Sequence, residues 1–187
     1  MSFVTRAKIR VDRVSGGGVW QDFVIDAGGL KAPGSKPATA IAHGSLEIPA
    51  WQFADAGAGN ENSISFAVKM PGCFDRTTNP QFLLGWSSAS TGNCKWQFEY
   101  VWRAPDEDTT AAAQETLTVV DAASSTANGL VPTTINSSDI DLPAAGDIVL
   151  HARVKRLSAD AQDTITDTVE LQGVILRIVA DCVGEAV

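Results

Sequence analysis

The most restrictive feature of this sequence is its division into short apolar segments separated by turn-forming residues. Ile64, Phe66 and Val68 alternate with polar neighbours, as expected for a strand with one buried face. Clusters such as Pro71-Gly72 stand between the segments. Short strands at this spacing are typical of an antiparallel β-sandwich or barrel, of which we favour the sandwich, and the lack of alternating helices disfavours a parallel α/β fold. The predicted strands cover residues 46–48, 63–70, 82–87, 95–102, 115–120, 133–140, 148–157 and 168–179.

The first 44 residues differ in composition from the rest of the chain. Residues 3–14 alternate apolar and basic side chains like a half-buried strand, and residues 20–25 form a second short apolar segment. Residues 27–44 are rich in glycine and proline, and Pro33 and Pro37 disfavour both a helix and a central strand. We therefore expect a strand or extended arm and a Gly/Pro-rich loop over residues 1–44, followed by a β-sandwich body over residues 45–187.

The charge of the chain is unevenly distributed. Its net charge at pH 7 is −8 and its pI is about 4.6, which argues against a nucleic-acid-binding protein. Residues 1–20 nevertheless carry a net charge of +3, and the remaining residues carry −11. This basic segment predicts either a contact with an acidic neighbour, such as another copy of the chain, or the solvated face of an edge strand. Its cations are Arg6, Lys8, Arg10 and Arg13.

Export, membrane insertion and a disulfide framework are not indicated. No apolar run reaches the length of a transmembrane helix, and the N-terminus lacks the charged start and apolar block of a signal peptide. The three cysteines, Cys73, Cys94 and Cys182, do not have the spacing of a metal site. We expect free thiols in a reducing compartment, and a bridge between Cys73 and Cys94 stays open as an alternative.

Residues that could carry chemistry are few, and we expect no catalytic residue, cofactor or metal. The two histidines are His43 and His151, and no serine stands in a Gly-x-Ser-x-Gly sequence. The acidic run Asp160, Asp163 and Asp167 offers the oxygen ligands that calcium prefers, but its spacing differs from the EF-hand pattern. Asp163 therefore predicts a turn cap, with an ion site as the alternative.

One predicted strand carries a row of aromatic side chains. The period-two alternation places Trp96, Phe98, Tyr100 and Trp102 on one face and the polar side chains of Gln97 and Glu99 on the other. A row of this length predicts either a core or a seam between subunits.

The segment from Trp86 to Val174 also carries an ordered set of short motifs. These are Gly85-Trp86, residues 91–100, Gly146-Asp147, residues 153–156, Asp163-Thr164 and residues 171–174. In this order and spacing, the set resembles a β-sandwich module found in structural proteins of tailed bacteriophages and prophages. The resemblance spans residues 46–178. It implies a jelly-roll-like sandwich in a virion structural protein, often displayed as a trimer, and it transfers no enzymatic residues.

On this resemblance, the leading hypothesis is a non-enzymatic capsid decoration or cement protein that binds and stabilises the outer shell. Its partners would be the major capsid protein and copies of itself in a homotrimer, without nucleic acid, membrane or small-molecule ligand. It would be assembled in the host bacterial cytoplasm and reside on the capsid surface of the virion.

Two further hypotheses come from other classes of protein. One is a tail-fibre or baseplate module that binds host surface glycan, with Trp51 and the loop at Asp106 as candidate contacts. The other is a polysaccharide-degrading tail enzyme, which would need two carboxyl groups facing each other across a cleft.

Overall fold

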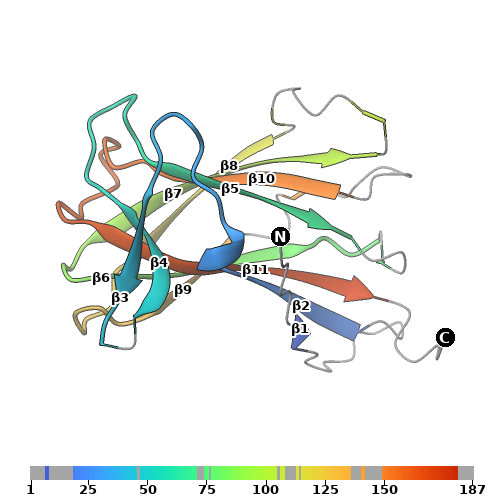
Figure 1. Cartoon of the computed structure of the whole chain (residues 1–187), viewed down its shortest axis with the longest axis horizontal. Coiled ribbons are helices and arrows are strands. Elements are labelled where there is room, and N and C mark those ends of the chain that lie inside the picture. Colours follow the sequence, from blue (N-terminus) through green and yellow to red (C-terminus); the bar gives the residue numbers. More distant parts are fainter. Residues whose placement is uncertain are drawn as a thin grey trace.

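The computed structural model describes residues 7–8, 19–45, 47–70, 74–75, 77–104, 106–107, 113, 115–135, 140–141 and 149–180. In this part of the chain the strands form two antiparallel sheets (Figure 1), which confirms the predicted antiparallel β-sandwich. The elements in chain order are β1 (Ala7–Lys8), β2 (Val19–Asp26), the 3-10 helix η1 (Ala27–Gly29), β3 (Thr39–His43), β4 (Ile48–Phe53), β5 (Ser63–Lys69), β6 (Gln81–Ser88), β7 (Asn93–Arg103), β8 (Glu115–Ala122), β9 (Val131–Ile135), β10 (Val149–Arg156) and β11 (Val169–Ala180).

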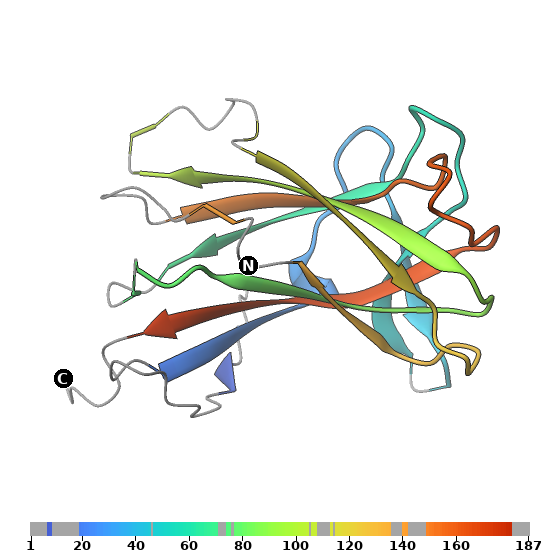
Figure 2. The same cartoon turned by 180° about the vertical axis from the view of Figure 1, so that it is seen from behind.

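The seven-stranded sheet is organised around β11. Strand β6 pairs with one edge of β11 over residues 169–177, and β9 pairs with the far side of β6. The other edge of β11 is shared, because β4 pairs with residues 169–171 and β2 pairs with residues 173–180. Strand β3 extends the sheet beyond β4, and β1 extends it beyond β2. Figure 2 shows β11 with β2 beside it from the other side of the molecule.

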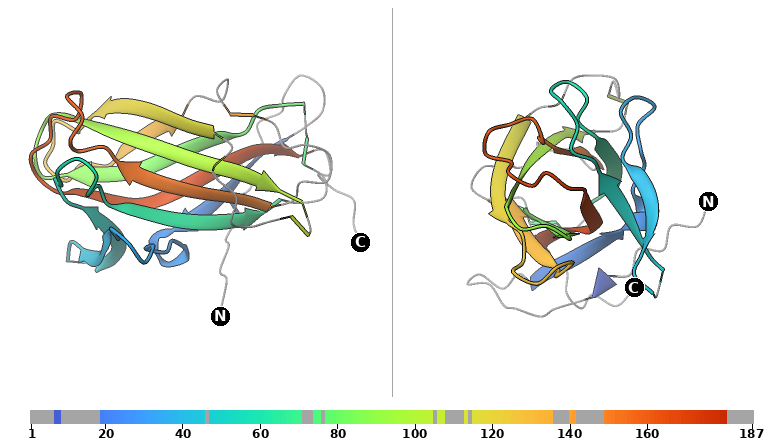
Figure 3. Two further views of the ribbon diagram at one scale, coloured as in Figure 1. Left: turned by 90° about the horizontal axis from the view of Figure 1, so that it is seen from above. Right: turned by 90° about the vertical axis from the view of Figure 1, so that its left-hand side faces the viewer.

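The four-stranded sheet has the order β5-β10-β7-β8. Strand β10 lies between β5 and β7, and its register places Arg153 opposite Glu99 of β7 and Ser65 of β5. After β8 the chain turns and continues as β9 in the other sheet. Seen along the strands, the two sheets enclose the core between them (Figure 3). The outward side chains of β7 and β10 therefore share one surface.

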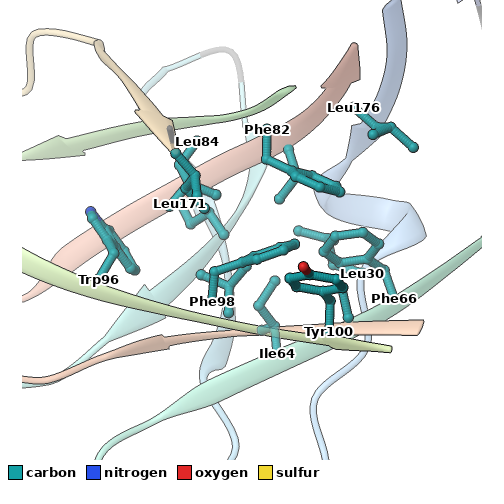
Figure 4. Close-up of a cluster of buried hydrophobic side chains, with 14 of the residues drawn as sticks. Leu30, Ile64, Phe66, Phe82, Leu84, Trp96, Phe98, Tyr100, Leu171 and Leu176 are labelled. Atoms are coloured by element: carbon teal, nitrogen blue, oxygen red, sulfur yellow. The ribbon is translucent and has the colours of Figure 1, made fainter. Parts of the chain in front are cut away.

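The core between the sheets is rich in aromatic side chains (Figure 4). Trp96, Phe98 and Tyr100 of β7 are each at most 1% exposed. The rings of Phe98 and Phe82, which come from opposite sheets, have centroids 4.4 Å apart, and Trp96 meets Phe53 edge-on at 5.3 Å. Such rings bury roughly 150–250 Å² each and dominate the hydrophobic stabilisation of a core. The aromatic row predicted from the sequence is therefore core and not a subunit seam.

The segment that the sequence predicts as a loop contains regular structure. Residues 27–29 form η1, and residues 39–43 form β3, which pairs with β4. Between them, Lys31 and Pro37 bridge to Ser65 and Ser63 on β5. The composition of this segment does not indicate β3. A strand of this length is stabilised by its partner strand more than by its own residues. Residues 1–6 and 9–18, most of the predicted arm, lie outside the described residues, and the division at residues 44 and 45 stays a prediction.

Candidate binding surface on the four-stranded sheet

The outward face of the four-stranded sheet carries an ion pair between two neighbouring strands. Arg153 points outward because the inward positions of β10 are taken by its buried neighbours Ala152 and Val154. Its Nε donates to Oε2 of Glu99 at 2.6 Å, and its terminal NH2 group donates to the same oxygen. The side-chain amide of Gln97 donates to the other oxygen of Glu99. Glu99 is thus held on both oxygens, while the Arg153 side chain stays 49% exposed.

A depression with a volume of about 210 Å³ lies beside this ion pair. Three segments meet in it: the loop before β3, the loop between β4 and β5, and the outward side of β10. Its lining is polar and positively charged on balance, because three cations face one carboxylate. The described lining residues are Ser35, Lys36, Gly59, Glu61, Ser63, Arg153 and Lys155.

Hydrogen bonds fix the two loops against each other. The Ser63 N–H donates to the carbonyl of Lys36 at 3.1 Å, and the Ala38 N–H donates to the carbonyl of Ser63 at 3.1 Å. The side chain of Asn62 donates to the carbonyl of Pro37 at 2.8 Å and accepts from the Ala54 N–H at 2.9 Å. The shape of the depression therefore rests on bonds that belong to the folded sandwich.

Two residues of the lining have a left-handed backbone. Gly59 has a φ of +76°, in a turn closed by the Asn60 N–H and the Gly57 carbonyl at 2.9 Å. Glycine adopts this conformation without a steric penalty. Lys36 has a φ of +52°, which is uncommon for a residue with a side chain. This conformation of Lys36 is held by the contact between its carbonyl and β5.

Glu61 is the carboxylate among the described residues that line the depression. Partial burial acts to raise the pKa of its carboxyl group, but the N–H groups of Glu61 and Gly59 and the charges of Lys155 and Lys36 outweigh burial. The pKa of Glu61 is therefore below its ordinary value. Its Oε2 lies 3.8 Å from Nζ of Lys155. At neutral pH the depression holds a fixed negative charge surrounded by cations.

A second ion pair, on the inward side of β10, orders the loop between β10 and β11. Arg156 and Asp163 are both fully buried, and their side chains form two hydrogen bonds of 3.0 and 2.8 Å. Arg156 also donates to the carbonyls of Phe53, Ile165 and Asp167. Burial acts to lower the pKa of Arg156, but the hydrogen bond and charge of Asp163 raise it on balance. This guanidinium is fully engaged within the fold.

The three aspartates of the acidic run form hydrogen bonds that hold this loop against β7 and its neighbouring segments. Asp163 also accepts from the Lys95 N–H at 3.0 Å, so these bonds tie it to β7 and β10 and not to the turn that the sequence predicts it to cap. Asp160 accepts from Nζ of Lys95 at 2.8 Å, and Asp167 accepts from the Ser90 hydroxyl at 3.1 Å. These hydrogen bonds, with those from neighbouring N–H groups, lower the pKa of both aspartates. Among the described residues, no cluster of His, Cys, Asp and Glu side chains has the arrangement of a metal site.

The interaction residues predicted from the sequence either are not among those that line the depression or lie outside the described residues. Arg6, Arg10 and Arg13 are not among the described residues. Lys8 lies on β1, in register with Asp22 of β2. Trp51 lies on β4 and not in a loop, and its indole N–H donates to the carbonyl of Ala27 at 2.8 Å. The half-buried Trp51 ring packs against the core, and its role as a ligand contact stays a prediction.

Sequence reasoning missed the residues that line the depression. The alternation of His151, Arg153 and Lys155 with apolar residues was a visible signal of a cationic strand face. The contribution of Lys36 and Glu61 had no such signal, because both lie in loops that meet β10 only through the tertiary fold.

Cys94 is a buried free thiol on β7. Burial, with a further contribution from Asp163, raises its pKa far above the ordinary value, so it stays protonated. Cys73 and Cys182 lie outside the described residues. The described part of the chain contains no helix with the length and apolarity needed to cross a membrane.

No protein-family model matches this sequence, and no curated protein matches it. Among solved structures, similarity is found to the CBM36-1 domain of a multidomain xylanase from the hindgut metagenome of Trinervitermes trinervoides, with 8% identity and a TM-score of 0.46 over 89% of this chain and 99% of that one. The C-terminal family 22 carbohydrate-binding module of Clostridium thermocellum Xyn10B has 14% identity and a TM-score of 0.45 over 93% and 100%. The xylan-binding module CBM86 from Roseburia intestinalis has 16% identity and a TM-score of 0.41 over 86% and 96%.

The prediction of a capsid decoration or cement protein is wrong. The solved structures named above are carbohydrate-binding modules, and none of them is described as a virion protein. The short motifs behind that prediction, apart from Gly146-Asp147, which lies outside the described residues, occupy strands and turns of the sandwich. Motifs of this kind are explained by the β-sandwich fold alone. Similarity at this level assigns no ligand to the chain. The predicted partners, the trimer and the location stay untested, as does a tail setting for the glycan-binding alternative.

Proposed function

We propose that this chain is a non-catalytic carbohydrate-binding module that holds a glycan on the outward face of the four-stranded sheet. The observation that carries the proposal is the polar depression beside Arg153, where hydrogen-bond donors and acceptors from three separate segments converge. Binding sites for small ligands are concave and hold a few placed polar groups that fix the orientation of the ligand.

The side chains of the depression have hydrogen-bonding capacity beyond their contacts within the protein. A guanidinium has five N–H groups, and Glu99 engages the Nε group and one terminal nitrogen of Arg153. Lys155 faces Glu61 at 3.8 Å, which is an ion pair and longer than a hydrogen bond. Neighbouring hydroxyl groups of a sugar ring both donate and accept hydrogen bonds. Arg153 and Lys155 would donate to them, and Glu61 would accept.

The composition of the lining predicts weak binding. None of the seven described lining residues is aromatic, so a sugar ring would not stack on an aromatic face here. Affinity would rest on hydrogen bonds, each of which contributes a net stabilisation of only about 1 kcal/mol because water competes for the same groups. A dissociation constant in the range of about 0.1–1 mM, or about −5 kcal/mol, follows for a short oligosaccharide.

The carboxyl groups of the described residues favour binding over hydrolysis. A glycosidase needs a general acid whose pKa is raised, so that the proton is still present near neutral pH. The described carboxyl groups whose pKa departs from its ordinary value are all shifted downward, and they are Glu61, Asp75, Asp160 and Asp167. Glu99, the carboxylate beside the depression, is bound by Arg153 and Gln97. These groups are set up as acceptors.

A glycan array followed by isothermal titration calorimetry tests this proposal. The array identifies bound glycans, and calorimetry with the best oligosaccharide compares the intact chain with Arg153→Gln. Loss of one charged hydrogen bond should weaken binding about tenfold. Lys69→Gln is the matched control, because Lys69 is an exposed cation on the same sheet, six residues from Ser63 along β5, or about 20 Å.

The outcomes separate cleanly. Binding that weakens in Arg153→Gln and is unchanged in Lys69→Gln supports a site at the depression. Equal binding by both variants would move the site elsewhere on the molecule. A chain that binds no glycan on the array at millimolar concentration is not a carbohydrate-binding module. Release of reducing ends from a bound polysaccharide would contradict the non-catalytic part of the proposal.

A further inference from the structure

We infer that the glycan is acidic, and that a carboxylate or other anionic substituent of a sugar enters the depression between Lys36, Lys155 and Arg153. This inference rests on the proposed function and extends it to the class of saccharide. It follows from three observations. The depression is positively charged, Glu61 and Glu99 already interact with its cations, and the chain as a whole carries a negative net charge.

The depression is a cationic place on an acidic protein. The chain has a net charge of −8, yet three of the seven described lining residues are cations. Like charges placed close together repel each other, and this repulsion is relieved only by an opposite charge nearby. A neutral sugar would leave the repulsion among these cations unchanged. An anionic group would relieve this repulsion, so the depression should bind an anionic sugar more tightly than a neutral one.

The carboxylates present do not balance these cations. Lys155 and Lys36 both act on Glu61, as the lowered pKa of Glu61 records. Arg153 is paired with Glu99 from β7. Even when Glu99 is included, three cations face two carboxylates, and one positive charge remains uncompensated. An anionic substituent would balance it.

The geometry of the cations suits a bound anion. Lys36 comes from the loop before β3, whereas Arg153 and Lys155 stand two residues apart on β10 and point to the same side. The depression therefore has cations on two of its walls, with the hydroxyl groups of Ser35 and Ser63 also in the lining. Arginine binds carboxylates through its planar fork of N–H groups, and lysine acts as a point charge on any anion.

The test compares an acidic polymer with a neutral polymer of the same backbone. Polygalacturonate is compared with the same polymer after chemical reduction of its carboxylates to CH₂OH groups, by calorimetry or affinity electrophoresis at low salt. The acidic form should bind at least fivefold more tightly, and the difference should shrink in about 0.5 M NaCl, where the Debye length is only several ångströms. A sulfated glycosaminoglycan and its desulfated form make a second pair, which distinguishes sulfate from carboxylate as the anion.

Variants locate the charge effect. Lys36→Gln and Lys155→Gln should each weaken binding of the acidic polymer about three- to tenfold, because each removes one partly screened charge interaction. Both should change binding of the reduced polymer less than twofold. Lys69→Gln should behave as the intact chain with both polymers. Thermal unfolding of each variant, measured in parallel, shows whether the fold is retained.

The results distinguish failure of this inference from failure of the proposed function. Equal binding of the charged and reduced polymers of both pairs would overturn the inference and leave the carbohydrate-binding function standing. Preference for the acidic forms that persists unchanged in both Lys36→Gln and Lys155→Gln would also overturn it, because the charge effect would come from elsewhere. If the chain binds none of the four polymers and no glycan on the array, both the inference and the proposed function are overturned.

Discussion

Two arginines three residues apart on β10 make the same kind of contact in opposite surroundings. Arg156 faces the core, where it binds Asp163 with both side chains fully buried. Arg153 faces outward, where it binds Glu99 and stays 49% exposed. Arg156 also donates to three backbone carbonyls. The inward pair is thus completed by the chain itself, and the outward pair keeps unused donors.

This contrast indicates which ion pair has a structural role and which is suited to binding a ligand. A buried charge that lost its partner would have no water to replace it, so the inward pair is tied to folding. An exposed pair exchanges easily with water, contributes little to stability, and is available to a ligand. The face of the sheet, more than the residue type, decides the role.

The largest effect should come from breaking the inward pair. Arg156→Met leaves the carboxylate of Asp163 buried without its cation and frees the carbonyls of Phe53, Ile165 and Asp167. The free energy of unfolding should fall by about 3–5 kcal/mol. Urea denaturation followed by tryptophan fluorescence measures this change. A loss below about 1 kcal/mol would mean that the loop between β10 and β11 does not depend on Arg156.

A smaller loss of unfolding free energy should distinguish substitutions at two adjacent residues of β10. Val154 is fully buried and Lys155 points outward into the depression. Val154→Ala removes two methyl groups from a packed core and should cost about 2 kcal/mol of unfolding free energy. Lys155→Ala should cost less than about 0.5 kcal/mol, as is usual for surface positions. Equal urea midpoints for the two variants would contradict the assignment of inward and outward faces on β10.

The sequence predicts these faces well but not their partners. The alternation of β7 places Trp96, Phe98 and Tyr100 in the core, as predicted, because a side-chain period of two is a local property. The partner of Arg153 lies 54 residues away and the partner of Arg156 lies 7 residues away. The partner of Arg153 depends on the register of β10 against β7, which is set by the whole sandwich, and the partner of Arg156 depends on the path of the loop between β10 and β11.

The depression was not predictable for the same reason. Lys36 and Glu61 lie in segments whose composition indicates only loops, and Lys36 falls in the Gly/Pro-rich loop that the sequence places before the sandwich body. Backbone bonds between Lys36 and Ser63 bring that segment onto β5. Strand β9 begins at Val131 and includes Pro132, whereas the sequence predicts a strand from residue 133. An edge strand tolerates proline because one side of it makes no ladder bonds.

The outward pair should be dispensable for folding. Glu99→Gln removes the charge that holds Arg153, and the exposed position of Arg153 predicts a loss of unfolding free energy below about 1 kcal/mol. The same change should tighten binding of an acidic polymer about twofold at low salt, because one carboxylate beside the depression is gone. Destabilisation as large as that of Arg156→Met would erase the distinction between the two pairs.

The smallest effect concerns Glu61 and pH. Because the fold lowers the pKa of Glu61, its carboxylate contributes stability above the ordinary value of 4.5, and this contribution is lost as the pH falls through the lowered value. Glu61→Gln should therefore show a slightly smaller drop in urea midpoint than the intact chain between about pH 7 and about pH 3. Most of the drop should remain, since the pKa values of Asp75, Asp160 and Asp167 are also lowered by the fold. An identical drop in both proteins would mean that the fold does not lower the pKa of Glu61, so that neither the N–H groups nor the cations around it act on its carboxyl group.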